Sequence, residues 1–256
     1  MSLVAALATA LPLRPIDPAD PADPTAPPTD SFGSLLESVL DGGAGTQGPS
    51  ASIVVLLGIG LLSVAPALML MVTSFTKIFV VLAMVRNALG LTTVPPNQVL
   101  AGLTLFLSIF IMWPVLDQVN QAAVTPYLEG EIDFGQAFTA ATGPLSTFML
   151  AHTREEDLAL MTRAADLPNP ANASEVPFQT LVPAFMISEL RSAFIIGFVV
   201  FVPFLVIDLV VSAALMAMGM MMLPPVMISL PFKILLFILV DGWGLIVTTL
   251  VESYAT

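Results

Sequence analysis

Four long apolar blocks dominate the sequence and constrain its fold more than any other feature. They run over residues 53–85, 98–116, 178–218 and 226–251. A membrane-spanning helix needs about 20 predominantly apolar residues, and these blocks meet or exceed that length. With 57% hydrophobic and only 10% charged residues, the chain has too few charges to cover the surface of a soluble protein. The sequence therefore predicts an all-α membrane protein.

The composition also excludes several kinds of chemistry. The chain has no cysteine, so it cannot form disulfides, thiolate nucleophiles or cysteine metal sites. Its single histidine, His152, is expected at the surface and cannot form a histidine-rich metal centre. The net charge of −12 is wrong for a nucleic-acid binder, which needs a basic face. We expect no metal, no cofactor and no enzyme activity.

Two prolines are expected to interrupt the apolar blocks in which they lie. Pro66 lies within residues 53–85, and Pro203 lies within residues 178–218. Because proline removes an intrahelical hydrogen bond, we expect a kink or a break at each position. Gly90 follows the first block and is predicted to end its helix, since glycine readily adopts the left-handed conformation of a C-terminal cap. Membrane-associated, kinked helical hairpins are the expected architecture.

Charge and composition divide the chain into four segments. Residues 1–50 are acidic and proline-rich and are predicted to be disordered; their first 13 residues resemble a signal peptide without its basic start. Residues 51–116 should form a first helical hairpin. Residues 117–176 carry nine acidic residues and two arginines and should form a helical region. Residues 177–256 should form a second hairpin with a methionine-rich loop.

The distribution of basic residues predicts the orientation in the membrane. Lys77 lies toward the end of the first apolar block, and Arg86 lies in the loop that joins the first two blocks, which has no acidic residue. The loop that joins the second and third blocks is acidic. The positive-inside rule therefore places the first connection in the cytoplasm and residues 117–176 on the extracytoplasmic side. Within this acidic segment, Thr153 begins a T-x-x-E capping box, which predicts a helix from Arg154 capped by Thr153.

Several charged residues fall inside the apolar blocks, where an unpaired charge costs several kcal/mol. They are Lys77, Glu189, Arg191, Asp208, Lys233 and Asp241. Glu189 and Arg191 are two positions apart and therefore lie on different sides of a helix, so they cannot pair with each other. We expect these charges to find partners on other segments, and several of them to pair between identical chains of a multimer. A protease dyad of the two aspartates is the alternative, although the G-x-G-D pattern of such enzymes is absent.

A methionine run is the most unusual local feature. Six methionines occur within residues 216–227, among them the consecutive Met220, Met221 and Met222. Thioethers are ligands for copper(I), but neither cysteine nor histidine lies beside the run. Methionine is also flexible and polarizable, which suits an apolar gasket around an opening. Ordinary packing in a core or against lipid is the third interpretation, and the residues alone do not separate it from the gasket.

Several motifs, in order, resemble the FliP family, also called SctR, of type III secretion export gates. The pair S-F-T-K-I and R-N-A-L-G is typical of this family and resembles its flagellar branch. The resemblance extends over about residues 53–256. The matching segments are Thr73–Ile78, Arg86–Gly90, Pro95–Leu100, Phe148–Leu150, Thr153–Leu158, Pro203–Val210, Met218–Pro225, Leu230–Lys233 and Val240–Trp243.

The resemblance implies a core component of the flagellar export gate at the basal body in the inner membrane. In this family several copies, five by the family's pattern, wind with FliR and FliQ into a helical cone around a pore. FlhA and FlhB are the implied neighbours, and unfolded flagellar subunits are the implied cargo. The family's methionine loop, here Met220, Met221 and Met222, is the implied pore gasket. A stand-alone membrane channel or transporter is the alternative function, and an intramembrane aspartic protease is a further one.

Overall fold

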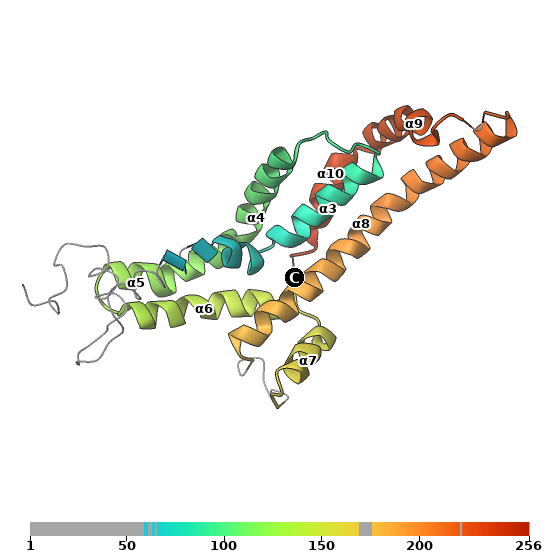
Figure 1. Ribbon diagram of the computed structural model, residues 1–256. Coiled ribbons are helices and arrows are strands. Elements are labelled where there is room, and N and C mark those ends of the chain that lie inside the picture. Colours follow the sequence, from blue (N-terminus) through green and yellow to red (C-terminus); the bar gives the residue numbers. More distant parts are fainter. Residues whose placement is uncertain (1–58, 61–62, 65, 169–175, 221, 256) are drawn as a thin grey trace, which may run out of the picture. The chain divides into compact units, whose positions relative to one another are not determined.

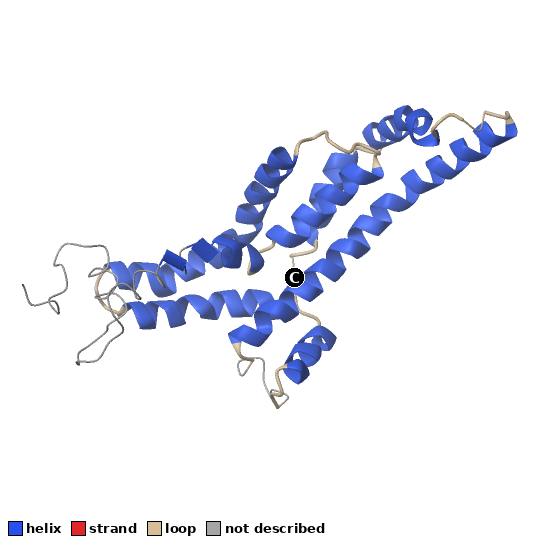
Figure 2. Ribbon diagram, viewed as in Figure 1, coloured by secondary structure: helices blue, strands red, loops and turns tan. Residues whose placement is uncertain are grey.

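A computed structural model describes residues 59–60, 63–64, 66–168, 176–220 and 222–255 of the chain. In this described part all regular structure is helical, which confirms the predicted all-α fold (Figure 2). The chain divides into two compact units, Met1–Ser63 and Val64–Thr256. The first contains almost none of the described residues. The segment predicted to be disordered, residues 1–50, lies outside them.

The elements of the second unit follow one another along the chain, and Figure 1 labels the α-helices among them. They are α3 (Phe75–Ala88), α4 (Asn97–Val119), the π-helical turn η1 (Asn120–Val124), α5 (Thr125–Leu128), α6 (Phe134–Ala151), α7 (Glu155–Ala164), α8 (Phe178–Ala217), α9 (Pro225–Leu239) and α10 (Gly242–Glu252).

The first apolar block has a break that its sequence does not predict. Residues 66–71 are helical, and the chain turns at residues 72–74 before α3 begins. The residue before Pro66 lies outside the described part of the chain, so the kink or break expected at this proline stays a prediction. With 14 residues, α3 is too short to span a bilayer, which needs about 20.

The C-terminus of α3 has the cap that its sequence predicts. Gly90 adopts the left-handed conformation, with φ of 79°. Its amide donates to the carbonyl of Asn87, and the amide of Leu91 donates to the carbonyl of Arg86. These two bonds are those of a Schellman motif, which uses helix-end carbonyls that would otherwise lack donors.

The second apolar block forms a longer helical run than predicted. α4 continues through η1 and α5, so that 32 residues from Asn97 to Leu128 are helical and apolar enough to cross a membrane. The π-helical turn contains one wider loop of hydrogen bonds, a feature that often marks functional positions. The expected boundary between residues 116 and 117 thus falls inside a helical run and not at its end.

The acidic segment contains α6 and α7. α6 begins with a capping box in which the side chain of Asp133 accepts from the amide of Gln136, and the Gln136 side chain accepts in return. The capping box predicted at Thr153 is wrong. The Thr153 hydroxyl donates instead to the carbonyl of Met149, at 2.7 Å, and α7 begins at Glu155 with no side-chain cap.

The third block forms one uninterrupted helix, in contrast to the predicted break at Pro203. α8 has 40 residues and contains both Pro183 and Pro203. At 1.5 Å per residue it is about 60 Å long. An apolar helix tolerates a proline where neighbouring segments compensate for the lost hydrogen bond.

The last block bends instead of running straight. α9 and α10 meet at 61°, and Asp241 at the corner adopts a left-handed conformation with φ of 50°. Within the described residues, two helices are long and apolar enough to cross a membrane, or three if the bent pair counts as one span.

Two apolar clusters hold the helices together. In the first, Ile78, Val81 and Val85 of α3 pack with Ala193 of α8 and Leu250 of α10. The second contains the fully buried side chains of α4, α6 and the start of α8, which are Met112, Met149, Leu181 and Phe185. Figure 1 shows α3 lying along α8, and this pair contributes most to the first cluster.

The close approach of α3 and α8 depends on Gly197. A Cβ atom at this position would lie 3.2 Å from the Cβ of Met84 and closer still to its sulfur. We expect Gly197→Val to separate the two helices and to lower the free energy of unfolding by about 1–3 kcal/mol, as overpacking does. Thermal unfolding of the chain in detergent measures the effect.

Gly102 of α4 provides the matched control, because nothing lies within 4 Å of a Cβ atom there. The same change, Gly102→Val, carries the same small gain in helix propensity without the clash. Equal destabilisation by the two substitutions would show that the contact between α3 and α8 is not tight.

Candidate functional site: buried ion pairs and the methionine loop

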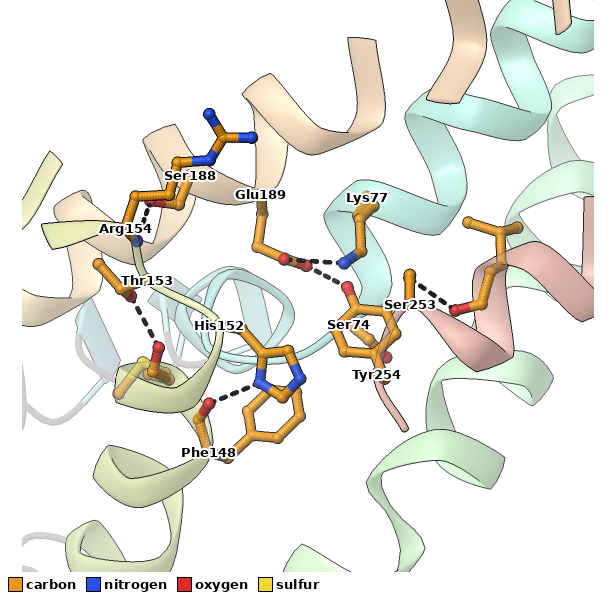
Figure 3. A network of polar contacts seen from close by, with 12 residues as sticks. Ser74, Lys77, Phe148, His152, Thr153, Arg154, Ser188, Glu189, Ser253 and Tyr254 are labelled. Carbon is orange, nitrogen blue, oxygen red and sulfur yellow. Dashed lines mark hydrogen bonds and ion pairs between the residues drawn. The ribbon is translucent and has the colours of Figure 1, made fainter. Parts of the chain in front are cut away.

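The first buried ion pair joins α3 to α8. The Nζ atom of Lys77 lies 3.1 Å from Oε1 of Glu189, and the side chains are only 3% and 1% exposed. The Tyr254 hydroxyl donates to the same carboxylate, and Lys77 also lies over the Tyr254 ring, 3.6 Å from its centroid (Figure 3). The Lys77 ammonium therefore has both an ionic and a cation–π partner, which offset much of its desolvation.

Aromatic residues extend this pair toward α6. The ring of Tyr254 stacks on Phe148, with centroids 5.9 Å apart, and lies 5.0 Å from the ring of His152. The Nδ1 atom of His152 lies 2.8 Å from the Phe148 carbonyl. The expected surface histidine is thus half-buried at the junction of α6 with the C-terminal residues (Figure 3). Burial and the Glu189 carboxylate raise the pKa of Tyr254, so the phenol remains a hydrogen-bond donor.

A second ion pair joins α8 to α9. The Nζ atom of Lys233 lies 2.6 Å from Oδ2 of Asp208 and also donates to the carbonyl of Ala88, at 3.1 Å. The hydroxyl of Ser229 donates to the other carboxylate oxygen, at 2.5 Å. Ala88 is the last residue of α3, where the helix dipole favours a cation. One lysine thereby ties three helices together.

Arg191 forms a weaker link between α8 and α7. Its guanidinium lies 3.3 Å from Glu156 and 3.6 Å from Asp157, and its side chain is 44% exposed. Ser188, one turn before Arg191, donates to Asp157 at 2.7 Å and accepts from the backbone amide of Arg154 at 3.0 Å. The buried serine–aspartate bond, more than the exposed ion pair, positions α7.

Most of these charges find partners on other segments, as the sequence predicts, and pairing between identical chains stays a prediction. Lys77, Glu189, Arg191, Asp208 and Lys233 all have partners within one chain. The remaining charge, that of Asp241, is exposed and has no ion pair among the described residues.

The same contacts argue against the protease alternative. Lys233 and Ser229 contact the two oxygens of the Asp208 carboxylate. An aspartic protease dyad instead needs two carboxyls that share a proton. The Asp208 carboxylate therefore has the surroundings of a structural ion pair.

The methionine loop connects α8 to α9. Gly219, with φ of 75°, forms a second Schellman motif, in which its amide donates to Met216 and that of Met220 donates to Leu215. The side chain of Met222 is 99% exposed and that of Met220 is 41% exposed, while Met221 lies outside the described residues. Backbone geometry thus fixes where the loop leaves α8, and its described methionines have few contacts within the chain.

Sequence reasoning missed the neutral partners of these charges. Tyr254, Ser229 and Ser188 each hydrogen-bond to a carboxylate named above. Ser229 lies four residues before Lys233, on the same helical face, and this spacing was a usable signal. Nothing in the spacing of Tyr254 connects it to Glu189, 65 positions earlier.

The buried pair of Lys77 and Glu189 should behave differently from an exposed pair. Removing one partner leaves an uncompensated buried charge, so Lys77→Met or Glu189→Leu alone should cost about 3–5 kcal/mol of stability. The double variant should cost much less than the sum of the two. Arg191→Met is the control on the same helix, with an expected cost of about 1 kcal/mol or less because the pair is exposed. Thermal unfolding in detergent compares the four variants, and additive costs would contradict the coupling.

Comparison with known proteins identifies the family. Residues 58–250 match the FliP family. The flagellar biosynthetic protein FliP of Bacillus subtilis is 52% identical over 205 residues, which cover 80% of this chain and 93% of that protein. The protein of the same name from Pectobacterium carotovorum is 51% identical over 210 residues, 82% of this chain and 81% of that one. The protein of that name from Caulobacter vibrioides is 47% identical over 223 residues, which cover 86% of this chain and 84% of that protein. None of these names is that of an enzyme, and the chain belongs to the FliP family.

Proposed function

We propose that this chain is a core subunit of the flagellar type III protein export gate. Several copies, five by the family resemblance, would assemble with FliQ and FliR around a pore, next to FlhA and FlhB. The complex would stand in the inner membrane at the flagellar basal body and pass unfolded flagellar subunits. Membership of the FliP family supports the flagellar role, and the apolar helices support a place in the membrane.

The pattern of exposed side chains supports an assembly. The charged groups inside the apolar blocks are mostly paired within the chain, so its outer faces remain apolar. Large exposed apolar side chains on α4 and α8 include Phe106, Phe110, Phe194, Phe198 and Leu209. Apolar patches of this kind favour contact with other chains or with lipid. Copies of the chain and the other gate subunits are the proposed partners of these faces.

The exposed methionine loop is the single observation that carries the proposed pore function. A pore that passes a polypeptide has to adapt to a bulky chain and then prevent the leakage of ions. Methionine side chains can repack when the pore is empty and separate when it is occupied. An apolar constriction also blocks ions by dewetting. In this proposal Met220, Met221 and Met222 of neighbouring copies form the gasket, at a position fixed by Gly219 and Pro224.

Replacing Met220, Met221 and Met222 together by alanine tests the gasket. We expect normal assembly, because Met220 and Met222 have few contacts within the chain, together with raised ion leakage and disturbed secretion. Conductance and ion-dependent growth of cells that express the variant are the measurements, with the abundance of the complex followed in parallel.

A triple replacement by alanine of Met216, Met218 and Met227 is the matched control. These side chains are 61%, 65% and 65% exposed and lie on both sides of the loop but outside the methionine triplet. The control should leave conductance close to that of the wild type. Normal conductance of the loop variant at normal abundance would assign the triplet to ordinary packing.

The proposed orientation is testable because the chain has no cysteine of its own. Glu131, in the turn between α5 and α6, and Thr93, between α3 and α4, are both exposed. We expect Glu131→Cys to react with an impermeant thiol reagent added from outside, and Thr93→Cys to react only after the membrane is opened. The reverse pattern would overturn the orientation derived from the positive-inside rule.

A further inference from the structure

A ridge of apolar side chains runs along the outer face of α4. The buried side chains of this helix recur every four residues and are those of Leu100, Thr104, Ser108 and Met112. Because each residue of a helix is rotated by about 100° from the one before, residues two positions away point to the opposite side. The exposed side chains of Val99, Leu103 and Phe106 lie there and form the α4 ridge.

An open groove lies on a different face of the chain, since α3 separates α4 from α8 (Figure 1). Its volume is about 490 Å³, and it is lined by Met84 of α3 and by Arg191, Phe194, Ile195, Phe198 and Val199 of α8. Arg191 lies at one end of this α3/α8 groove, and the rest of the lining is apolar.

The ridge and the groove lie at nearly the same height along α3. The Ser74 hydroxyl donates to the Ser108 hydroxyl of α4, at 3.1 Å, and Met84 lies against Gly197 of α8. α4 runs opposite to α3, whereas α8 runs in the same direction. With a rise of 1.5 Å per residue, each ridge residue then lies about 3 Å in height from one groove residue. The matching pairs are Phe106 with Arg191, Leu103 with Phe194, and Val99 with Phe198.

We propose that the α4 ridge of one copy of this chain packs into the α3/α8 groove of the next copy. The inference rests on the proposed assembly of several copies around a pore. Rotation about the axis of a pore leaves every residue at its own height, so two surfaces meet only if they lie at similar heights in one chain. The ridge and the groove meet this condition, and their residues follow the same spacing of three and then four positions.

Arg191 favours a protein ridge over a lipid chain in the groove. Its guanidinium contacts Glu156 at 3.3 Å and Asp157 at 3.6 Å and is still 44% exposed. A planar guanidinium can bond carboxylates with its edge and stack its face on an aromatic ring. Phe106 of the neighbouring copy, which is 74% exposed, provides this ring at the height of Arg191. A hydrocarbon chain provides no such partner for a cation.

The contact joins two different surfaces, so each copy offers a ridge to one neighbour and a groove to the other. Such a heterologous contact produces a ring or a helix of copies and does not stop at a dimer. The proposed contact therefore explains how identical chains would continue around a pore.

Cysteine cross-linking in membranes that contain the assembled gate tests the contact, because the chain has no cysteine of its own. We expect the double variant Leu103→Cys with Phe194→Cys to form a ladder of dimers, trimers and larger species on mild oxidation, which a reductant reverses. Each single variant should stay uncross-linked. Leu103→Cys with Leu209→Cys is the matched control: Leu209 is also exposed on α8 but lies about 22 Å beyond Phe194, so no ladder should form.

Val99→Cys with Phe198→Cys tests the other end of the same contact and should form the same ladder. A dimer from Leu103→Cys alone would mean that two α4 ridges face each other, and would overturn the proposal. No ladder from either pair, in a complex whose native mass contains several copies, would mean that another subunit or lipid fills the groove. That result would reject this contact and leave the proposed function intact. A lone monomer in the presence of the other gate subunits would instead contradict the proposed assembly itself.

Discussion

The need to pair the charges that are buried in an apolar environment organises this structure. Lys77 and Glu189 lie almost completely buried, and each has further partners that reduce the cost of burial. Because these partners come from α3, α8 and the C-terminal residues, satisfying the pair also fixes the relative positions of these segments. The pair of Lys233 and Asp208 does the same for α3, α8 and α9. The two ion pairs thereby fix how far each helix is shifted along its neighbour. Apolar contacts alone would define this register poorly.

The sequence predicts those features that depend on composition and on local conformation. The helical class follows from the apolar blocks, and the end of α3 follows from Gly90. The need of each intramembrane charge for a partner also follows, but the identity of the partner does not. Partners are set by tertiary packing, which joins Glu189 to a tyrosine 65 positions away and Lys233 to a helix-end carbonyl 145 positions away.

Helix breaks were the least predictable feature, for a physical reason. A proline lacks the amide hydrogen that would bond the carbonyl four residues earlier. In a helix exposed to water, a water molecule can bind that carbonyl instead. Pro183 and Pro203 instead lie within an apolar helix whose interruption would expose further unpaired groups. Within the described residues of the apolar blocks, helices break at residues 72–74 and at Asp241, where no proline lies. In the methionine loop, too, local conformation is set by a glycine and not by a proline. Gly219 fixes the backbone at the end of α8, and the side chains of Met220 and Met222 remain exposed.

The length of α8 has a consequence for how the chain is handled in the cell. A helix of 40 residues tilted by 40°, the upper end of the usual range, still extends about 46 Å along the membrane normal, whereas the hydrocarbon layer is about 30 Å thick. Part of an almost wholly apolar helix then has to be shielded by protein instead of lipid. A copy made in excess of its partners would present that part to water, where chaperones and proteases recognise exposed apolar segments. Balanced synthesis of the subunits is therefore a requirement imposed by the dimensions of one helix.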